Sequence, residues 1–499
     1  MAATLLAQST FEAPSIDWWA LVPQMVLLGA ALLLLLVTSM SPRRVPSWVS
    51  TAVSIGAGSA TFVIALGLWY DVRDDGARST VGGAFVVDGF SLFFTVLIAV
   101  AVVATALVAH SYLEREGIVV PEFHALLLCS AAGAIVMASA NDLIVLFLGL
   151  ESLSIALYVL IALHVRRSEA RESAMKYFVL GAFSSAFFLY GIALVYGATG
   201  STNLAVIRDY LIEFRLIDEH LLMTGMALLL TGLAFKVAAA PFHFWAPDVY
   251  QGAPSPVTGY MATVAKAAGF AALLRVFFVA FGDFEAEWTP VITGLAVMTL
   301  LTGSLMAIVQ TDVKRMLAFS SVTHAGFVLV AVQAASDDGT AAALFYLFTY
   351  TLMAIGSFAV VGVMGWNDGH RLERYAGLAR SRPVLAFGFT VFLLAQAGVP
   401  LTSGFIAKFV VINASVGAEN YVLAAVAMFT AVIGAFMYLR IVMAMYVTDE
   451  GDADAERPSV PVTSAIVLFG AVAFTVVVGF IPQFLLEFSS DAIPVLIAG

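Results

Sequence analysis

TGLAFKVAAAPFHFWAPDVYQGAPSP, from Thr231 to Pro256, is the segment on which the interpretation of the whole chain depends. It places Lys236 in an apolar run and Pro241 five residues later. A lysine inside a run long enough to cross a membrane is costly, so it is a functional-site hypothesis by default. A proline beside it removes a backbone hydrogen bond and tends to break the helix. Freed backbone groups in a membrane need protein or a water-filled cavity beside them, so the segment predicts a buried charge on a broken helix.

Composition places the chain among polytopic membrane proteins. Of its 499 residues, 61% are hydrophobic and only 11% are charged, whereas about a quarter of the residues of a soluble protein are charged. The mean hydropathy is +0.98. The single cysteine, Cys129, excludes a disulfide framework, a zinc cluster and a cysteine-ligated iron–sulfur centre within this chain. No GxGxxG fingerprint precedes a soluble α/β pattern. We therefore expect a surrounding lipid bilayer, no bound cofactor or metal, and no nucleic-acid partner.

Fourteen apolar segments are each long enough, at roughly 20 residues, to cross a hydrocarbon core of ~30 Å. They are 17–39, 47–70, 88–113, 122–139, 142–164, 172–199, 221–248, 256–281, 289–309, 315–333, 340–366, 384–416, 420–447 and 460–482. The segments 221–248 and 384–416 each contain an internal proline, and the second would be ~50 Å long as a straight helix. We predict an all-α polytopic membrane protein of about fourteen transmembrane helices, with helices 7 and 12 discontinuous.

The distribution of basic residues predicts the orientation in the membrane. No lysine or arginine precedes Arg43, which is the reverse of the charge order of a secretory signal peptide. With the N-terminus outside, thirteen basic residues, including Arg43, Arg44 and Arg457, fall on the cytoplasmic side and four on the outer side. This positive-inside bias places both termini on the outer side. The alanine-rich, lysine-poor composition is typical of a GC-rich bacterial genome, which predicts the cell inner (plasma) membrane.

An internal repeat is a further expectation. Residues 122–281 and 289–448 each hold five predicted spans, have equal lengths and begin on opposite sides of the membrane. Three N-terminal helices in 1–121 would precede them, and a loop and the last helix in 449–499 would follow. The two discontinuous helices then occupy matching positions in two inverted five-helix halves. This pattern is the best sequence indication of a membrane transport site.

Two ionisable residues near the middle of predicted spans are the first candidate site residues. Glu151 lies in LIVLFLGLESLSIALYVLIAL, whose apolar runs favour a protonatable carboxylate facing the bundle interior. The alternative is a glutamate that only satisfies a neighbouring serine or backbone group. Lys236 lies too far from either surface for its side chain to reach it, so it needs a buried partner. A Glu151–Lys236 pair of variable spacing is our hypothesis for switching Lys236 between holding and releasing a proton.

Two further lysines lie in later spans. Lys266 is in GYMATVAKAAGFAALL, where small neighbours allow close helix packing. Lys408 is in AQAGVPLTSGFIAKFVVINAS, where Pro400 and two glycines predict an unwound stretch. The alternatives are a Lys266 side chain that reaches the surface and an ordinary kinked helix end at Lys408. We favour a functional role for both lysines.

Other polar residues complete the candidate set. His324, in LAFSSVTHAGFVLV, can donate and accept a proton near neutral pH, although a helix–helix hydrogen bond explains it equally well. We expect His243 to help satisfy the break after Lys236. A relay role for Lys176 is open, and we expect Arg275 to reach the outer surface.

Five motifs carry a resemblance to a known family: FLGLESLSIALYVL, SAMKYF, FKVAAAPFHFWAPDVYQGAPSPVT, DVKRMLAFSSVTHAGF and GVPLTSGFIAKF. The chain resembles, over nearly all of its length, the antiporter-like subunits of proton-pumping NADH:quinone oxidoreductase, respiratory complex I. The motif PDVYQGAP differs from the PDAH that sister subunits L and M tend to have. Lys408 stands where subunit M would have a glutamate, and we expect no long lateral helix after the last span, as subunit L would have.

The resemblance implies fourteen helices with two inverted five-helix units. It assigns proton transfer to six residues: Glu151, Lys236, Lys266, His324, Lys408 and, as a residue sometimes included, Lys176. It implies that NADH, FMN, iron–sulfur clusters and quinone are bound by partner subunits. It further implies membrane-arm neighbours, namely the antiporter-like subunit M and the small subunits K, J and A.

Three functions fit these observations. The first is a proton-translocating membrane-arm subunit of NADH:quinone oxidoreductase, which is enzymatic only as part of the translocase because the chain carries no redox centre. The alternative is a subunit of a multi-subunit Mrp-type cation/proton antiporter, which shares this architecture. A third is a structural scaffold whose buried charges only fix helix packing. The PDVYQGAP motif favours the first.

Overall fold

The computed structural model describes residues 16–41, 46–118, 120–214, 220–365, 370–447 and 459–495. The helices up to the middle of the chain are α1 (Trp18–Met40), α2 (Ser47–Asp75), α3 (Gly89–Glu116), α4 (Val120–Ser139), α5 (Leu143–Ala162), α6 (Ser168–Thr199), α7 (Leu204–Phe214), α8 (His220–Val237), α9 (Trp245–Gly252), α10 (Ser255–Tyr260) and α11 (Lys266–Leu274). The later helices are α12 (Glu285–Ile308), α13 (Val313–Gln333), α14 (Asp337–Met364), α15 (Leu378–Ser381), α16 (Pro383–Ala397), α17 (Ser403–Gly417), α18 (Tyr421–Tyr446), α19 (Val462–Phe480) and α20 (Gln483–Ser490).

Shorter elements join these helices. The strands β1 (Arg78–Thr80) and β2 (Phe85–Val87) form an antiparallel hairpin between α2 and α3. The π-helical turns η1 (Met261–Ala265) and η2 (Arg275–Ala280) continue α10 and α11, so that residues 255–280 form one membrane-length helix. The 3-10 turns are η3 (Gly282–Phe284) and η4 (Leu372–Tyr375).

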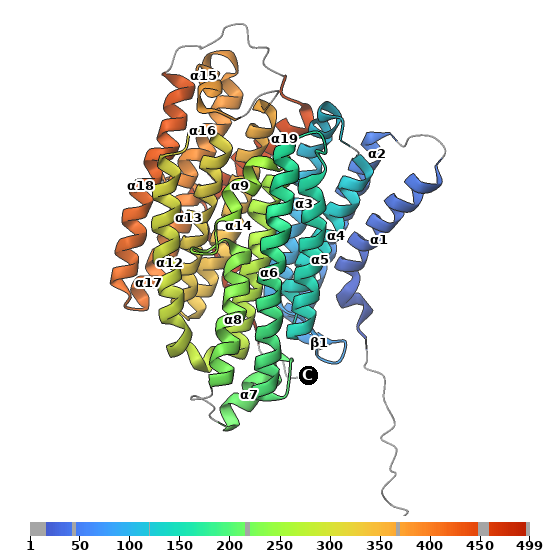
Figure 1. The fold of residues 1–499 in the computed structure, drawn as a ribbon, viewed down its shortest axis with the longest axis vertical. Helices are drawn as coiled ribbons and strands as arrows, with labels where there is room; N and C mark the ends of the chain where they lie inside the picture. Colours follow the sequence, from blue (N-terminus) through green and yellow to red (C-terminus); the bar gives the residue numbers. More distant parts are fainter. Residues whose placement is uncertain are drawn as a thin grey trace, which may run out of the picture.

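The predicted spans are confirmed. Within the described residues, thirteen helices are long and apolar enough to cross a membrane, and α16 and α17 are shorter apolar helices. Together α16 and α17 occupy the predicted span 384–416, which accounts for the fourteenth. Figure 1 shows the helices running side by side in one bundle, with α1 and α2 at one edge and α17 and α18 at the opposite edge. The chain ends and the topology markers Arg43, Arg44 and Arg457 lie outside the described residues.

The predicted break in the seventh span lies between α8 and α9. The indole Nε1 of Trp245 donates to the carbonyl of Phe235, 3.0 Å away, at the end of α8. The backbone N–H of Ala240 donates to the hydroxyl of Thr299 on α12 at 2.8 Å. These side chains satisfy backbone groups that the break frees. His243 contributes as well, since its imidazole interacts with the backbone of Pro241 in the break, while its Nδ1 is buried without a hydrogen-bond partner among the described residues.

The predicted break in the twelfth span lies between α16 and α17. Gly398 ends α16 with φ of +88°, and its N–H bonds to the carbonyls of Leu394 and Ala395 at 3.0 and 2.9 Å. This left-handed conformation is one that glycine adopts at little cost. Gly404 then starts α17 so close to α16 that a Cβ there would lie 1.9 Å from the carbonyl oxygen of Ala395. The half-helices therefore pack tightly at the break.

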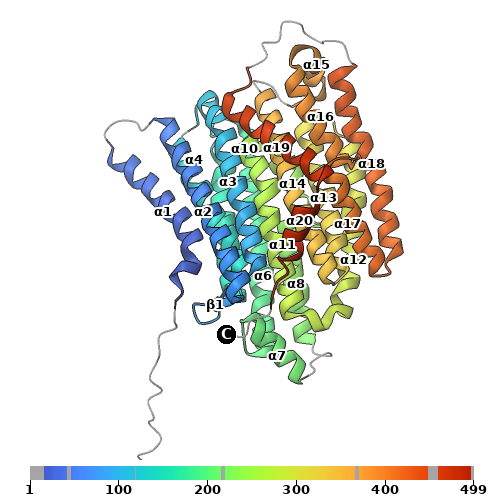
Figure 2. The ribbon, with the colours of Figure 1, turned by 180° about the vertical axis from the view of Figure 1, so that it is seen from behind.

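Three spans form the centre of the bundle. Residues 255–280, α13 and α14 are each 94% buried along their apolar windows, so they contact protein on almost every side. Figure 2 shows α19 running obliquely across the bundle face, where it packs on α3, α14, α16 and α17. A charge carried by a central span is therefore enclosed by protein and not by lipid.

The prediction that Arg275 reaches the outer surface is wrong. Its guanidinium is fully buried and binds the carboxylate of Asp88 in two places, at 2.6 and 2.9 Å. A third bond, at 2.9 Å, goes to the carbonyl of Ala138. Asp88 caps the N-terminus of α3 and is 187 residues away in sequence. A bidentate arginine–carboxylate pair offsets the desolvation cost of burying both charges. Without such a partner, the arginine would have to extend its side chain to water to avoid this cost.

Candidate functional site

Lys236 lies inside the bundle, in the last turn of α8, with only 4% of its surface exposed. Its Nζ donates to the hydroxyl of Ser154 on α5 at 2.7 Å and to that of Tyr177 on α6 at 3.5 Å. The ammonium also lies 5.9 Å from the centre of the Tyr177 ring. Two hydroxyls and a ring face thus solvate the ammonium, in place of a carboxylate bound to it directly.

Glu151 lies on α5, three residues before Ser154, and is close enough to act on Lys236 electrostatically. In the hypothesised pair of variable spacing, the two groups are not in direct contact here, since no Glu151 oxygen within the described residues lies within 4.0 Å of the ammonium and the Ser154 hydroxyl binds it. The Oε1 of Glu151 is buried without a hydrogen-bond partner in this part of the chain. An unpaired carboxylate oxygen one helical turn from the serine that binds Lys236 can bind a proton or a second partner.

A small cavity with several hydroxyls in its wall adjoins Lys236. Its volume is about 10 Å³, which is close to the minimum that one water molecule requires. It is lined by Leu150, Ser154, Tyr158, Tyr177, Gly181, Ser184, Ser185, Phe188, Gly232, Phe235 and Lys236. Because hydroxyls dominate its polar lining, the cavity can hold a water molecule that exchanges protons with Lys236.

Lys266 is the next buried lysine. It is 2% exposed and begins α11 directly after the π-helical turn η1. Its Nζ donates to the main-chain carbonyl of Ser321 on α13 at 2.5 Å, which rules out the alternative that it extends to the surface. Gly269, one turn later, packs on the stem of Lys236, because a Cβ there would lie 3.2 Å from the Lys236 Cγ. The glycine therefore brings the two lysine-bearing helices together.

His324 lies on α13, is 3% exposed and makes two hydrogen bonds. Its Nδ1 is 2.6 Å from the hydroxyl of Tyr346, and its Nε2 is 3.0 Å from that of Tyr438. The Tyr438 hydroxyl continues to Ser320 at 2.5 Å. Both ring nitrogens of His324 are thus engaged with groups that can donate or accept, as a proton relay requires.

Lys408 lies on α17 and is 8% exposed. Its Nζ donates to the carbonyl of Ala397 at 2.8 Å, at the C-terminal end of α16, where a helix dipole favours a positive charge. The ring of Phe327 lies 5.0 Å away. The broken helix thus supplies the ligand for its own lysine.

A second cavity of about 10 Å³ adjoins Lys408. It is lined by Ser304, Ala307, Ser320, Thr323, His324, Phe327, Gln396, Lys408, Thr430, Ala431, Gly434, Met437 and Tyr438. His324 and Lys408 therefore share one polar space. Each interrupted helix has a buried lysine with a water-sized cavity beside it.

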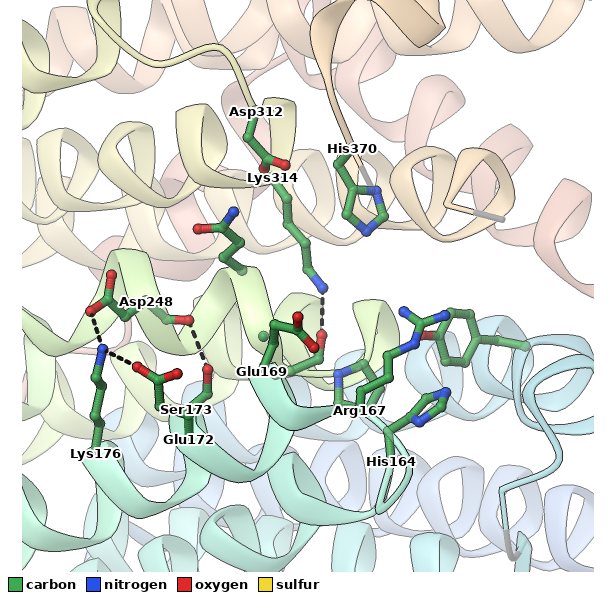
Figure 3. Close-up of a pocket in the computed structure, with 15 residues that line it drawn as sticks. His164, Arg167, Glu169, Glu172, Ser173, Lys176, Asp248, Asp312, Lys314 and His370 are labelled. Atoms are coloured by element: carbon green, nitrogen blue, oxygen red, sulfur yellow. Dashed lines mark hydrogen bonds and ion pairs between the residues drawn. The ribbon is translucent and has the colours of Figure 1, made fainter. Parts of the chain in front are cut away.

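Lys176 does not join the buried residues. Its side chain is 44% exposed and forms ion pairs with Glu172 at 2.8 Å and Asp248 at 3.0 Å. Figure 3 shows it on the rim of a larger cavity of about 530 Å³. Its amphipathic side chain lies at the helix end, where both carboxylates are within reach.

The remaining candidates form a row across the bundle. The order is Glu151 on α5, Lys236 on α8, Lys266 on α11, His324 on α13 and Lys408 on α17. Glu151 interacts electrostatically with Lys236, and Lys266 with His324, while His324 and Lys408 border one cavity. Lys236 and Lys266 lie on helices that pack together at Gly269. Sequence analysis missed the polar groups between them, namely Ser154, Tyr177, Tyr346, Gln396 and Tyr438. Their position in the middle of apolar spans was a usable indication.

The row consists of groups that can bind and release protons. Within the described ranges, no cluster of three or more His, Cys, Asp or Glu side chains could hold a metal ion. The arrangement therefore supports proton transfer between buried side chains and water.

Comparison with known proteins gives the family. The family described as "NADH:quinone oxidoreductase/Mrp antiporter, TM" matches residues 140–434, which include every member of the row. The chain is 40% identical over 520 aligned residues to NADH-quinone oxidoreductase subunit N of Salinispora arenicola (strain CNS-205), covering 97% of this chain and 99% of the relative.

Two solved structures share the fold. A chain of respiratory complex I from Thermus thermophilus with bound aureothin is 32% identical with a TM-score of 0.79, covering 94% of this chain and 99% of the other. A chain of the Mrp complex from Dietzia sp. DQ12-45-1b has a TM-score of 0.83 at 20% identity, covering 95% and 96%. The fold is common to both assemblies, and the sequence separates them. The chain therefore belongs to the family of NADH-quinone oxidoreductase subunit N.

Proposed function

We propose that this subunit translocates protons across the membrane within NADH:quinone oxidoreductase, while electron transfer from NADH to quinone takes place in other subunits. The observation that carries the proposal is the row from Glu151 to Lys408, which crosses the bundle through Lys236, Lys266 and His324. Buried lysines are costly, and they persist here where hydroxyls, carbonyls and small cavities can exchange their protons.

The mechanism starts at Glu151. A change of charge in a neighbouring subunit alters the charge or position of this carboxylate, whose Oε1 has no partner among the described residues. Lys236 then loses or regains its proton, because a nearby negative charge stabilises the ammonium and its removal does not. Lys266 and His324 pass the change on, and Lys408 exchanges a proton with the outer side.

The energies involved are compatible with this mechanism. Moving one charge against ~150 mV costs about 3–4 kcal/mol. Changing the contacts of a poorly solvated charged pair can amount to several kcal/mol. One rearrangement around Lys236 is therefore large enough to drive one proton.

The assembly we propose follows from the family. NADH, FMN, iron–sulfur clusters and quinone belong to partner subunits, and the neighbours are the antiporter-like subunit M and the small subunits K, J and A. The complex lies in the cell inner membrane with both termini of this chain outside. Residues 122–281 and 289–448 act as two inverted half-channels, between three N-terminal helices in 1–121 and the last helix in 449–499.

Two other functions are less well supported. An Mrp-type antiporter subunit has the same fold, but the solved Mrp chain is only 20% identical. A scaffold role would require that the buried charges be paired for packing, as Arg275 and Asp88 are. Lys236, Lys266 and Lys408 instead bind hydroxyl or carbonyl oxygens, which leaves their protons exchangeable.

Replacing Lys236 with alanine in the assembled complex tests the proposal. We expect NADH-driven proton translocation by membrane vesicles to fall. The matched control is Thr231→Ala on the same helix, whose exposed hydroxyl bonds only to the carbonyl of Ala227. Wild-type translocation by Lys236→Ala, at equal amounts of assembled complex, would remove the assigned role.

A further inference from the structure

A large cavity lies outside the row of buried lysines. It has a volume of about 530 Å³ and lies where α6, α9, α13 and the segment after α14 meet. This is the end of the bundle that the basic residues predict to be cytoplasmic. Its titratable lining residues are Tyr112, His164, Arg167, Glu169, Glu172, Lys176, Asp248, Asp312, Lys314 and His370. We call this cavity the vestibule.

Lys314 is the buried cation of the vestibule. It is 2% exposed and stands in the first turn of α13, where the helix dipole disfavours a positive charge. Its Nζ donates to the carbonyl of Ala253, at the joint between α9 and α10. No carboxylate of the described segments lies within ion-pair distance of it, and Figure 3 shows its side chain extending into the vestibule. A costly position with a single hydrogen bond indicates a role beyond packing.

His370 stands beside Lys314 in the vestibule wall (Figure 3). Burial, together with the positive charges of Lys314 and Arg167, holds the pKa of His370 well below its usual value. The imidazole is therefore neutral at pH 7, and its Nδ1 has no hydrogen-bond partner in the described parts of the chain. An unprotonated ring nitrogen at this position can accept a hydrogen bond from water in the vestibule.

A file of unpartnered hydroxyls leads inward from Lys314. Ser255 follows the Ala253–Pro254 joint, and its hydroxyl is buried without a partner in the described chain. The hydroxyl of Tyr250 is likewise buried without a hydrogen-bond partner in the described chain. It lies near the hydroxyls of Ser321 and Tyr350. Buried hydroxyls are almost always hydrogen-bonded, so water must serve these two in the hydrated protein.

The file ends at Lys266. The Tyr350 hydroxyl donates to that of Ser321 at 2.8 Å, and Lys266 donates to the main-chain carbonyl of the same serine at 2.5 Å. Aromatic contacts hold the Tyr250 ring, whose centre lies 6.1 Å from that of Trp245 and 6.2 Å from that of Phe358. These ring contacts fix the position of the Tyr250 side chain beside Ser321 and Tyr350.

We propose that the vestibule takes up protons for this subunit and that Lys314, Ser255, Tyr250 and Tyr350 conduct them, with water, to Lys266. The inference rests on the proposed function and adds the uptake route to it. Each transfer breaks one N–H or O–H bond and forms one on the next group, while the vestibule water replaces the proton that leaves Lys314. No oxidant or reductant takes part.

The test uses the whole complex in inverted membrane vesicles, whose cytoplasmic face is outward. We expect Tyr250→Phe combined with Ser255→Ala to lower NADH-driven proton translocation by the same fold as Lys236→Ala. The matched control is Tyr260→Phe, because Tyr260 is also fully buried with an unpartnered hydroxyl among the described residues but lies off the file. We expect it to translocate protons at the wild-type rate.

The outcomes separate the two proposals. Wild-type translocation by the double variant, with Lys236→Ala impaired, would overturn the uptake route and leave the proposed function standing. Wild-type translocation by Lys236→Ala as well would overturn the proposed function itself.

A second measurement does not depend on pumping. In a Cys129→Ser background, a membrane-impermeant, charged thiol reagent should modify Ser255→Cys from the outward, cytoplasmic face of the vesicles. Complete protection of that cysteine would overturn a water-accessible route from the vestibule.

Discussion

The Nζ of Lys236 lies 2.7 Å from the Oγ of Ser154, on the α5 turn that follows Glu151. The ammonium of the hypothesised Glu151–Lys236 pair is therefore bound by a serine hydroxyl, and the carboxylate acts on it at a longer distance. A change of charge at Glu151 acts on Lys236 through space. The serine is the element of the site that can be changed without removing a charge.

Ser154→Ala should slow proton translocation by about tenfold, since a hydrogen bond to a charged group contributes roughly 1.5–3 kcal/mol. The initial rate of NADH-driven acidification in vesicles measures the effect. Thr293→Ala is the control, because that hydroxyl bonds only to the carbonyl of Thr289 on α12. An unchanged rate for Ser154→Ala would show that the hydroxyl is not part of the path.

Glu151→Gln should keep the complex assembled and impair translocation. The amide has the shape of the carboxylate but cannot carry its negative charge, so Lys236 loses the group that stabilises its ammonium. Glu151→Asp should retain part of the activity. Translocation by Glu151→Gln equal to that of the unaltered complex would argue against Glu151 as the start of the row.

Gly269→Ala should destabilise the subunit by about 1–3 kcal/mol and reduce translocation. The new Cβ would lie 2.9 Å from Val237 Cγ1 and 3.2 Å from Lys236 Cγ, which forces α8 and α11 apart. Gly294→Ala is the matched control, because no heavy atom lies within 4 Å of a Cβ at that position. Thermal denaturation of the purified complex compares the two, and equal melting temperatures would contradict the packing argument.

Asp88→Asn should be the most destabilising of these changes, at about 3–5 kcal/mol, because it leaves the buried Arg275 without its counter-charge. Asp283→Asn breaks the partly exposed ion pair with Arg208 and should cost less than about 1 kcal/mol. The amount of folded subunit after graded heating measures both. A similar loss of stability for the two variants would mean that the buried ion pair stabilises the subunit no more than the partly exposed one.

Local sequence patterns predicted much of the fold and half of the site. A lysine or glutamate inside an apolar run, such as Lys236 or Glu151, is conspicuous in one dimension because the bilayer tolerates few charges. The breaks were also indicated locally, by Pro241 and by Gly398, although Pro23 and Pro290 lie inside continuous helices.

The parts that were not predicted depend on long-range contacts. Asp88 and Arg275 form an ion pair although they are 187 residues apart in sequence. The local sequence around either residue does not indicate its partner. The vestibule is built from segments on both sides of the centre of the chain, so no single stretch of sequence predicts it. The buried ion pair and the vestibule both depend on which spans lie next to each other in space. Sequence periodicity gives no information about these distances.

The ammonium of Lys266 donates its hydrogen bond to the main-chain oxygen of Ser321 and not to a side chain. Every amino acid brings the same carbonyl, so no codon change at position 321 can delete this acceptor. Genetic screens for loss of proton translocation will therefore find the lysine itself and pass over its partner, whose contribution only a backbone ester substitution could expose.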